Sequence, residues 1–174
     1  MREAELRKTE TGLVPEGKGW FVVNVRDASW LTTEGAGTWL TFEAEGVSQQ
    51  VGVGVHMLPP GESTGRYHVE SDQEGFFVLS GECLLVVEGE ERRMQQWDYF
   101  HSPPGTAHIL IGGEGGCTLF MFGARTPGGL TDYLPDPVAA KHGASVKERT
   151  DDSRDAYADL DWTFTPVKAP WPGT

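Results

Sequence analysis

Short runs of apolar and β-branched residues, each closed by glycine or proline, form the pattern of this chain. The run at 50–58 places Val51, Val53 and Val55 at alternate positions before Pro59 ends it. Alternation of this kind over a short run is typical of a half-buried strand. Comparable runs predict strands at 20–25, 39–45, 50–58, 76–79, 83–88, 91–96, 99–102, 108–112 and 118–123. Many short strands with glycine turns and only late helices predict an all-β sandwich or barrel.

The segments outside this run of strands have a different character. Residues 1–19 are polar and glycine-rich, which indicates an N-terminal arm. The strands at 20–125 form one predicted barrel domain, in which the glycines at 112–116 are most simply a hairpin loop. Residues 126–174 predict an extension with two short helices, each capped by an aspartate, and an aromatic tail that packs on the barrel or on a partner subunit.

Composition and charge narrow the classes of partner. The chain has 174 residues, which is most simply one domain, and its formal net charge is −12. This charge argues against nucleic acid and against an anionic membrane surface as partners. The first ten residues contain no apolar core of a signal peptide, and no apolar run approaches the length of a membrane helix. A cytoplasmic location is therefore expected.

Both cysteines, Cys83 and Cys117, lie inside apolar strand-like runs. Two buried thiols in a reducing compartment are the default expectation, with a disulfide between neighbouring strands as the alternative. Cys83 has no nearby histidine or cation in the sequence that would lower its thiol pKa, so we do not expect it to act as a nucleophile.

The residues best suited to bind a metal or to act in catalysis lie between Gly61 and Gly81. His68 and Glu70 are two positions apart, so on a strand they face the same side. The polar turn at 71–73 lets Glu74 open the next strand and point back to the same space. One imidazole and two carboxylates in one place are ligands that a divalent cation can use, and His108 is a fourth candidate downstream.

The pattern of these residues resembles the two motifs of the cupin superfamily. His68, Glu70, Glu74 and Gly81 follow the first motif, Gly-x5-His-x-His-x3–4-Glu-x6-Gly, although Glu70 stands where the second histidine is usual. The segment Pro103-Pro104-Gly105-Thr106-Ala107-His108 matches the centre of the second motif. The other departures are Gly61, which is one residue early, Trp97 in place of a glycine, and Gly112 in place of an asparagine. The resemblance covers roughly 51–123.

The resemblance implies a double-stranded β-helix, a jelly-roll barrel with a metal inside one open end. It implies that His68, Glu74 and His108 are metal ligands, with the metal one of Fe, Mn, Zn or Ni. It also implies a small-molecule substrate and a homodimer. Among cupin activities we expect an oxygenase first, then an isomerase or a decarboxylase or other lyase. The alternative is a non-catalytic barrel that binds a metal or a small ligand.

Glu70 leaves three interpretations open. As a fourth ligand, it would give a site of two histidines and two carboxylates, which favours harder cations. As a non-ligand, it would leave a two-histidine, one-carboxylate triad and serve as a proton acceptor beside bound substrate. Without a metal, Glu70 and Glu74 would pair with Arg66 or share a proton, because two close carboxylates repel each other.

The other histidines have no motif around them. A single histidine in a barrel is most often packed or on the surface, and this is the expectation for His56, His101 and His142, although His56 and His101 are placed in the sequence where they could line the cavity mouth. Tyr67 neighbours His68 and should face the opposite side of its strand, as part of the core.

Overall fold

The computed structural model describes residues 2–44, 47 and 49–171, so Glu45 of the predicted strand 39–45, Met1 of the arm and residues 172–174 of the tail lie outside the described residues. The elements follow the predicted order of strands first and short helices late. The strands are β1 (Glu5–Lys8), β2 (Leu13–Glu16), β3 (Trp30–Thr32), β4 (Thr38–Thr41), β5 (Val51–Leu58), β6 (His68–Glu70), β7 (Glu74–Val87), β8 (Glu90–Gln95), β9 (Tyr99–Ser102), β10 (His108–Ala124), β11 (Thr131–Tyr133) and β12 (Thr165–Val167). The helices are α1 (Pro137–Ala140) and α2 (Ser153–Ala156).

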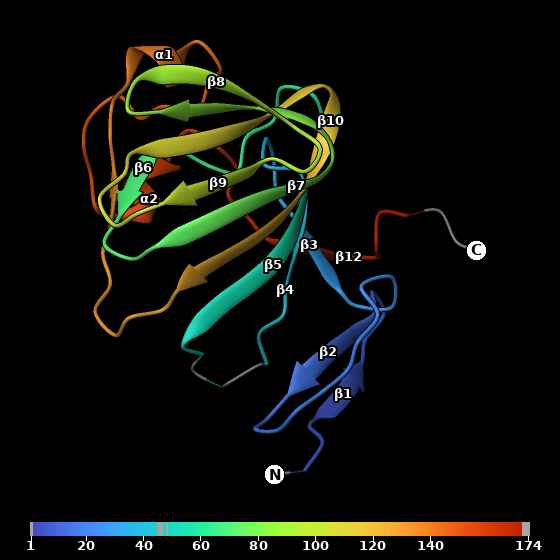
Figure 1. The fold of residues 1–174 in the computed structure, drawn as a ribbon. Helices are drawn as coiled ribbons and strands as arrows, with labels where there is room; N and C mark the ends of the chain where they lie inside the picture. The colour runs from blue at the N-terminus through green and yellow to red at the C-terminus, as the bar shows by residue number, and fades with distance from the viewer. Residues whose placement is uncertain (1, 45–46, 48, 172–174) are drawn as a thin grey trace.

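Two long strands, β7 and β10, build both layers of the barrel (Figure 1). The second half of β7 pairs with β8 and with the start of β10, whereas its first half pairs with β9 and with the end of β10. The end of β10 also pairs with β5, and β5 continues the sheet through β4, β3 and β12. Strands β6 and β11 extend the other layer from His108. The all-β jelly-roll prediction is confirmed.

The predicted hairpin loop at 112–116 is wrong, because β10 runs through these glycines as one 17-residue strand. Its register against β7 shifts between Gly112 and Cys117, and this irregularity lets one strand serve both layers. β7 likewise merges the predicted strands 76–79 and 83–88 into one strand that passes through Gly81 at a φ of 73°. Glycine is required here because a left-handed φ is costly for other residues.

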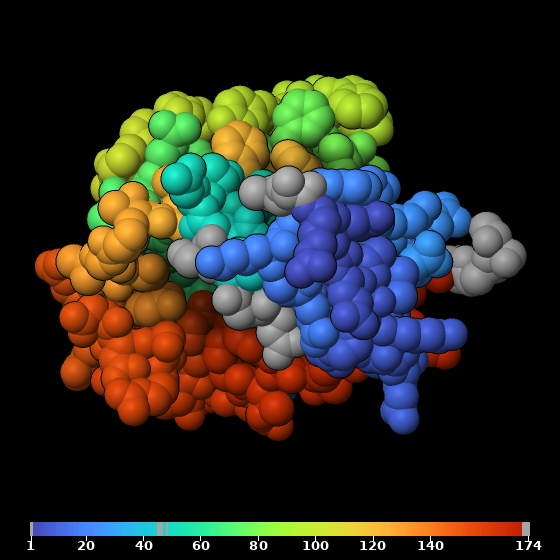
Figure 2. Space-filling view, turned by 90° about the horizontal axis from the view of Figure 1, so that it is seen from below, coloured from blue at the N-terminus to red at the C-terminus, as the bar shows by residue number. Residues whose placement is uncertain are grey.

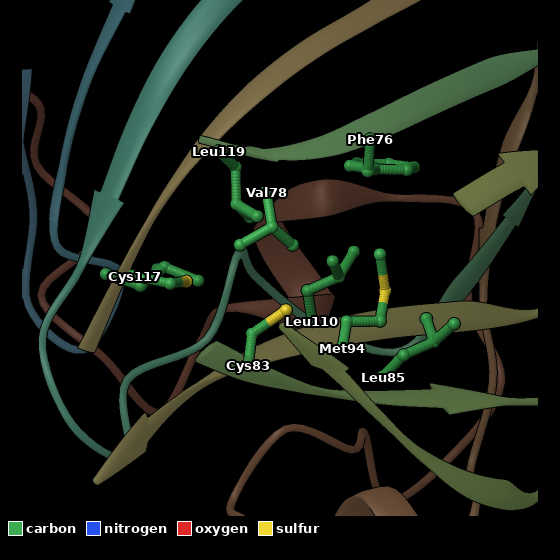
Figure 3. Packing of buried hydrophobic residues seen from close by; sticks show 9 residues of the cluster. Phe76, Val78, Cys83, Leu85, Met94, Leu110, Cys117 and Leu119 are labelled. Atoms are coloured by element: carbon green, nitrogen blue, oxygen red, sulfur yellow. The ribbon is translucent and has the colours of Figure 1, made fainter. Parts of the chain in front are cut away.

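The main core fills the space between the two layers (Figure 3). Val78 and Leu119 enter it from one layer, and Leu110 and Leu85 enter it from the other. Val78, Leu110 and Leu119 are fully buried, so this core excludes solvent between the two layers. The valine alternation of β5 does not point into this core: Val51 is 49% exposed and Val55 packs in a separate cluster with Trp30, whereas Leu58, on the opposite face of β5, lies in the main core.

The N-terminal arm contains the hairpin of β1 and β2, and the predicted strand at 20–25 is wrong. In that segment only Trp20 makes an isolated bridge, to Glu3. The C-terminal tail packs on its own barrel: β12 pairs with β3, and the ring of Trp171 contacts that of Trp30 at 5.2 Å between centroids. Figure 2 shows the N-terminal and C-terminal segments on the same face of the molecule.

The two short helices begin as expected at aspartate caps. The side chain of Asp136 accepts hydrogen bonds from two backbone N–H groups of α1. The cap of α2 is Asp152 rather than Asp151, and it accepts from the backbone N–H of Arg154. In the part of the chain that the structure describes, no helix is long and apolar enough to span a membrane.

Candidate metal centre

His108 begins β10 at the open end of the barrel, and its side chain is 1% exposed. The rings of Phe76 and Phe100 pack against it with centroid distances of 5.2 and 5.4 Å. Its Nδ1 lies 3.0 Å from the carbonyl oxygen of Thr106, which accepts the proton of that nitrogen. This bond fixes the ring and leaves Nε2 as the atom that can act as a ligand.

Glu74 begins β7, so its carboxylate comes from the opposite layer of the barrel to His108. Its Oε2 lies 3.3 Å from His108 Nε2. Both atoms are buried, and neither has a hydrogen-bond partner; Arg66 Nε is the third such atom among the described residues. Buried polar atoms without partners are rare and costly, so this pair is what a bound cation would satisfy.

His68 completes the group from β6, where it is the residue paired with His108. Its ring centroid is 5.0 Å from that of His108, and its Nδ1 lies 2.7 Å from the carbonyl oxygen of Arg66. Burial lowers the pKa of His68, and the neighbouring His108 lowers it further. A neutral imidazole with its outer nitrogen bonded to a carbonyl is the form that binds metals.

Glu70 lies beside this group and forms a separate set of contacts. Its Oε1 is 3.8 Å from His68 Nε2, and the hydroxyl of Thr131 donates to the same oxygen at 3.4 Å. Burial raises the pKa of Glu70, and the charge of Glu74 raises it further, whereas the charge of Arg125 lowers it. This carboxylate is therefore held close to the centre in an environment that disfavours its charge.

Arg66 does not pair with either glutamate, in contrast to the metal-free interpretation. Its Nη1 donates to the carbonyl of Gly143 at 2.5 Å, and its Nη2 donates to Asp159 Oδ1 at 2.5 Å. The guanidinium is thus anchored to the C-terminal extension and does not neutralise Glu70 or Glu74.

Two residues at the rim of the site were not found from the sequence. Tyr133 of β11 faces His68, with 6.0 Å between ring centroids. Arg125 follows the end of β10, and its Nη2 lies 3.5 Å from Glu43 Oε1. The sequence shows only that Arg125 stands two residues after Gly123. The structure adds that Gly123 pairs with Glu74.

The remaining histidines and both cysteines take structural positions, as expected. His56 is buried and bonded to the carbonyl of Ala36 at 2.5 Å, while His142 pairs with Glu91 on the surface and His101 is exposed. Tyr67 lies in a core cluster. Cys83 and Cys117 are buried and free, and the hydrogen bond between them raises the pKa of Cys83 together with burial.

The donor set fits a divalent cation. Within the described residues, ligand atoms of His68, Glu74 and His108 all lie within 4.8 Å of one another. Bonds from one ion to nitrogen and oxygen ligands are about 2.0–2.2 Å, so ligand atoms up to about 4 Å apart can share it. The three side chains would therefore need to move together by less than about 1 Å to share one ion. The structure brings Glu74 and His108 to within 3.3 Å of each other, and their role as metal ligands stays a prediction.

Part of the chain matches a known protein family, and solved structures share its fold. Residues 54–121 match the family model described as a cupin domain. A sugar phosphate isomerase of the cupin superfamily from Silicibacter pomeroyi is 21% identical over 86% of this chain and 83% of its own, with a TM-score of 0.50. A cupin 2 conserved barrel domain protein from Salinispora arenicola is 18% identical over 55% of this chain and 82% of its own, with a TM-score of 0.48. The comparison with curated proteins gave no match. The matched segment contains His68, Glu74 and His108, and residues 54–121 of the chain form a cupin domain.

Proposed function

We propose that this protein is a metal-dependent enzyme acting on a small organic molecule, with one divalent cation held by His68, Glu74 and His108. The observation that carries the proposal is the pair of buried atoms Glu74 Oε2 and His108 Nε2, which face each other without hydrogen-bond partners. Such a cation would polarise a substrate oxygen as a Lewis acid.

The three proposed ligands leave room for a chelating substrate. Two histidines and one carboxylate with open positions make the donor set used by non-haem Fe²⁺ oxygenases. His68 and Glu74 retain 17% and 15% of their side-chain exposure, whereas His108 is almost fully enclosed. The open side of the centre is therefore the side of His68 and Glu74, and an oxygenase is the first reaction class that we propose.

An isomerase or lyase is the second candidate, and the position of Glu70 favours it. Glu70 Oε1 lies 3.8 Å from His68 Nε2, and burial raises the pKa of its carboxyl group. A carboxylate with a raised pKa beside a bound substrate can accept a proton from carbon and return it. In this proposal Glu70 is a proton acceptor and not a ligand.

Elemental analysis of the purified protein tests the metal centre. We expect about one equivalent of a divalent metal per chain in the wild type, and loss of that metal in His108→Ala. His101→Ala is the matched control, because His101 is exposed. Retention of the metal in His108→Ala would contradict the proposal.

Two further measurements separate the reaction classes. An oxygenase consumes oxygen together with its substrate, whereas an isomerase or lyase turns over at the same rate without oxygen. Glu70→Gln should keep the metal and lose turnover if Glu70 moves a proton. Loss of the metal in Glu70→Gln would instead make Glu70 a ligand, and binding of ligands without any turnover would favour a non-catalytic barrel.

A further inference from the structure

The guanidinium group of Arg125 lies flat against Gly52 at the open end of the barrel. A Cβ atom built on Gly52 would be only 2.5 Å from Arg125 Cζ and 2.7 Å from its Nε, and it would also overlap Nη2. Gly52 pairs with Gly123 across β5 and β10. The guanidinium can therefore occupy this place only because residue 52 has no side chain.

The same face of the sheet carries Glu74. A Cβ built on Gly123 would lie 3.4 Å from Glu74 Cγ and 3.7 Å from Arg125 Nη1. Gly123 is also the residue paired with Glu74 across β7 and β10. The proposed ligand and the guanidinium thus flank one glycine on the inner face, with no side chain between them.

Within the part of the chain that the structure describes, the Arg125 side chain donates a hydrogen bond only to Glu43, which leaves donors for a ligand. Its contact with Glu43 Oε1 is long, at 3.5 Å, and the two side chains are 49% and 35% exposed. Ion pairs as exposed as this one are weak and easily replaced. A guanidinium presents five N–H donors in a planar fork that matches a carboxylate in two parallel hydrogen bonds.

We propose that Arg125 selects small organic acids as substrates by binding their carboxylate. The neighbouring hydroxyl or keto oxygen of the acid would then reach the centre of His68, Glu74 and His108. The inference rests on the proposed function and adds the chemical class of the substrate to it. A carboxylate fits better than a phosphate dianion because one guanidinium stands near four carboxylates, those of Glu43, Glu70, Asp72 and Glu74, in a chain of net charge −12.

Calorimetric titration of the Mn²⁺-loaded protein tests this inference. The probes are glycolate, lactate and pyruvate, the amides of these acids, and glycerol 1-phosphate. We expect at least one acid to bind the wild type, and Arg125→Gln to weaken it by about 10- to 100-fold, the range for a lost hydrogen bond to a charged group. The amides should bind weakly to both proteins, and Arg125→Lys should restore only part of the affinity.

Two variants separate a specific role from a general loss of charge. Gly52→Ala keeps Arg125 but displaces its guanidinium, so it should weaken acid binding as Arg125→Gln does. Arg92→Gln removes an exposed arginine paired with Glu90 on β8 and should leave acid binding unchanged. Bound Mn²⁺ should stay at one equivalent in every variant.

The possible failures are distinguishable. Failure of the wild type to bind any of Mn²⁺, Fe²⁺, Zn²⁺ and Ni²⁺ overturns the proposed function itself. If Mn²⁺ binds normally, three results would overturn only the role of Arg125. These are that no acid of the panel binds, that Arg125→Gln binds the acids as the wild type does, or that the phosphate ester binds as well as the acids.

Discussion

The hydroxyl of Tyr157 accepts the backbone N–H of Arg66 at 3.1 Å, and this bond joins the C-terminal extension to the candidate metal centre. The carbonyl of the same Arg66 accepts from Nδ1 of His68 at 2.7 Å. The Arg66 side chain reaches Asp159 in the same extension. Arg66 thus links the C-terminal extension to the proposed ligand His68. Through this link the extension helps to position the His68 imidazole.

Tyr157→Phe should therefore weaken metal binding by about 10-fold without unfolding the protein, because partners that orient a ligand typically matter by 10- to 100-fold in affinity. Competition with a chelator of known affinity measures the change. Tyr99→Phe is the matched control, since Tyr99 is an exposed tyrosine outside this connection. Unchanged metal affinity in Tyr157→Phe would leave the extension without a role at the centre.

Removal of the metal should lower the melting temperature of the wild type. A ligand present at 100 times its Kd stabilises the native state by about 2.7 kcal/mol, which for a chain of this size is a shift of about 5–10 °C. Differential scanning calorimetry with and without a chelator measures the shift. Glu74→Gln should melt at one temperature in both conditions, and an equal shift in this variant would place the cation elsewhere.

His56 should make the protein less stable in mild acid. Burial lowers its pKa to about 4, against the opposing effect of its bond to the Ala36 carbonyl. The unfolded chain takes up this proton near pH 6.5, so the native state loses stability as the pH falls from about 6.5 to about 4, by up to about 3 kcal/mol in all.

Urea unfolding at a series of pH values between 7 and 4.5 measures this loss. His56→Gln can still donate to the Ala36 carbonyl but does not titrate, so its unfolding free energy should fall less steeply with pH. His101→Gln, on an exposed strand position, should follow the wild type. Identical slopes for His56→Gln and the wild type would show that His56 is not the group responsible.

Gly81→Ala should destabilise the barrel more than Gly89→Ala does. Both glycines have a left-handed φ, 73° and 76°, which costs alanine about 1–2 kcal/mol. A Cβ on Gly81 would also collide with the Gly116 carbonyl and lie 3.0 Å from Cys117 Cα, whereas one on Gly89 meets only Asp136 Oδ2 at 3.5 Å. The additional overlap should cost about 1–3 kcal/mol more, measured by chemical unfolding. Equal losses in the two variants would contradict this packing.

The sequence by itself predicted the all-β class, most of the strands and the candidate residues of the centre, but the strand that it predicted at 20–25 is absent and the loop at 112–116 is part of β10. Alternation at Val51, Val53 and Val55 identifies a strand with two different faces because side chains alternate along any strand, but the structure shows that the face of Leu58 is the one in the main core. The spacing of His68, Glu74 and His108 matches the cupin motifs, and the structure brings these side chains together. These features are local, or lie in motifs whose order along the chain is enough to recognise them.

Only the tertiary structure decided the path of β10 through its glycines and the surroundings of the centre. Arg125 reaches Gly52 and Tyr157 reaches Arg66 through pairings between segments far apart in the chain. No local pattern encodes such contacts, because they depend on the register between strands and on how the ends of the two layers meet. The sequence thus singles out the proposed ligands, and the pairing of β5, β7 and β10 decides which residues stand next to them.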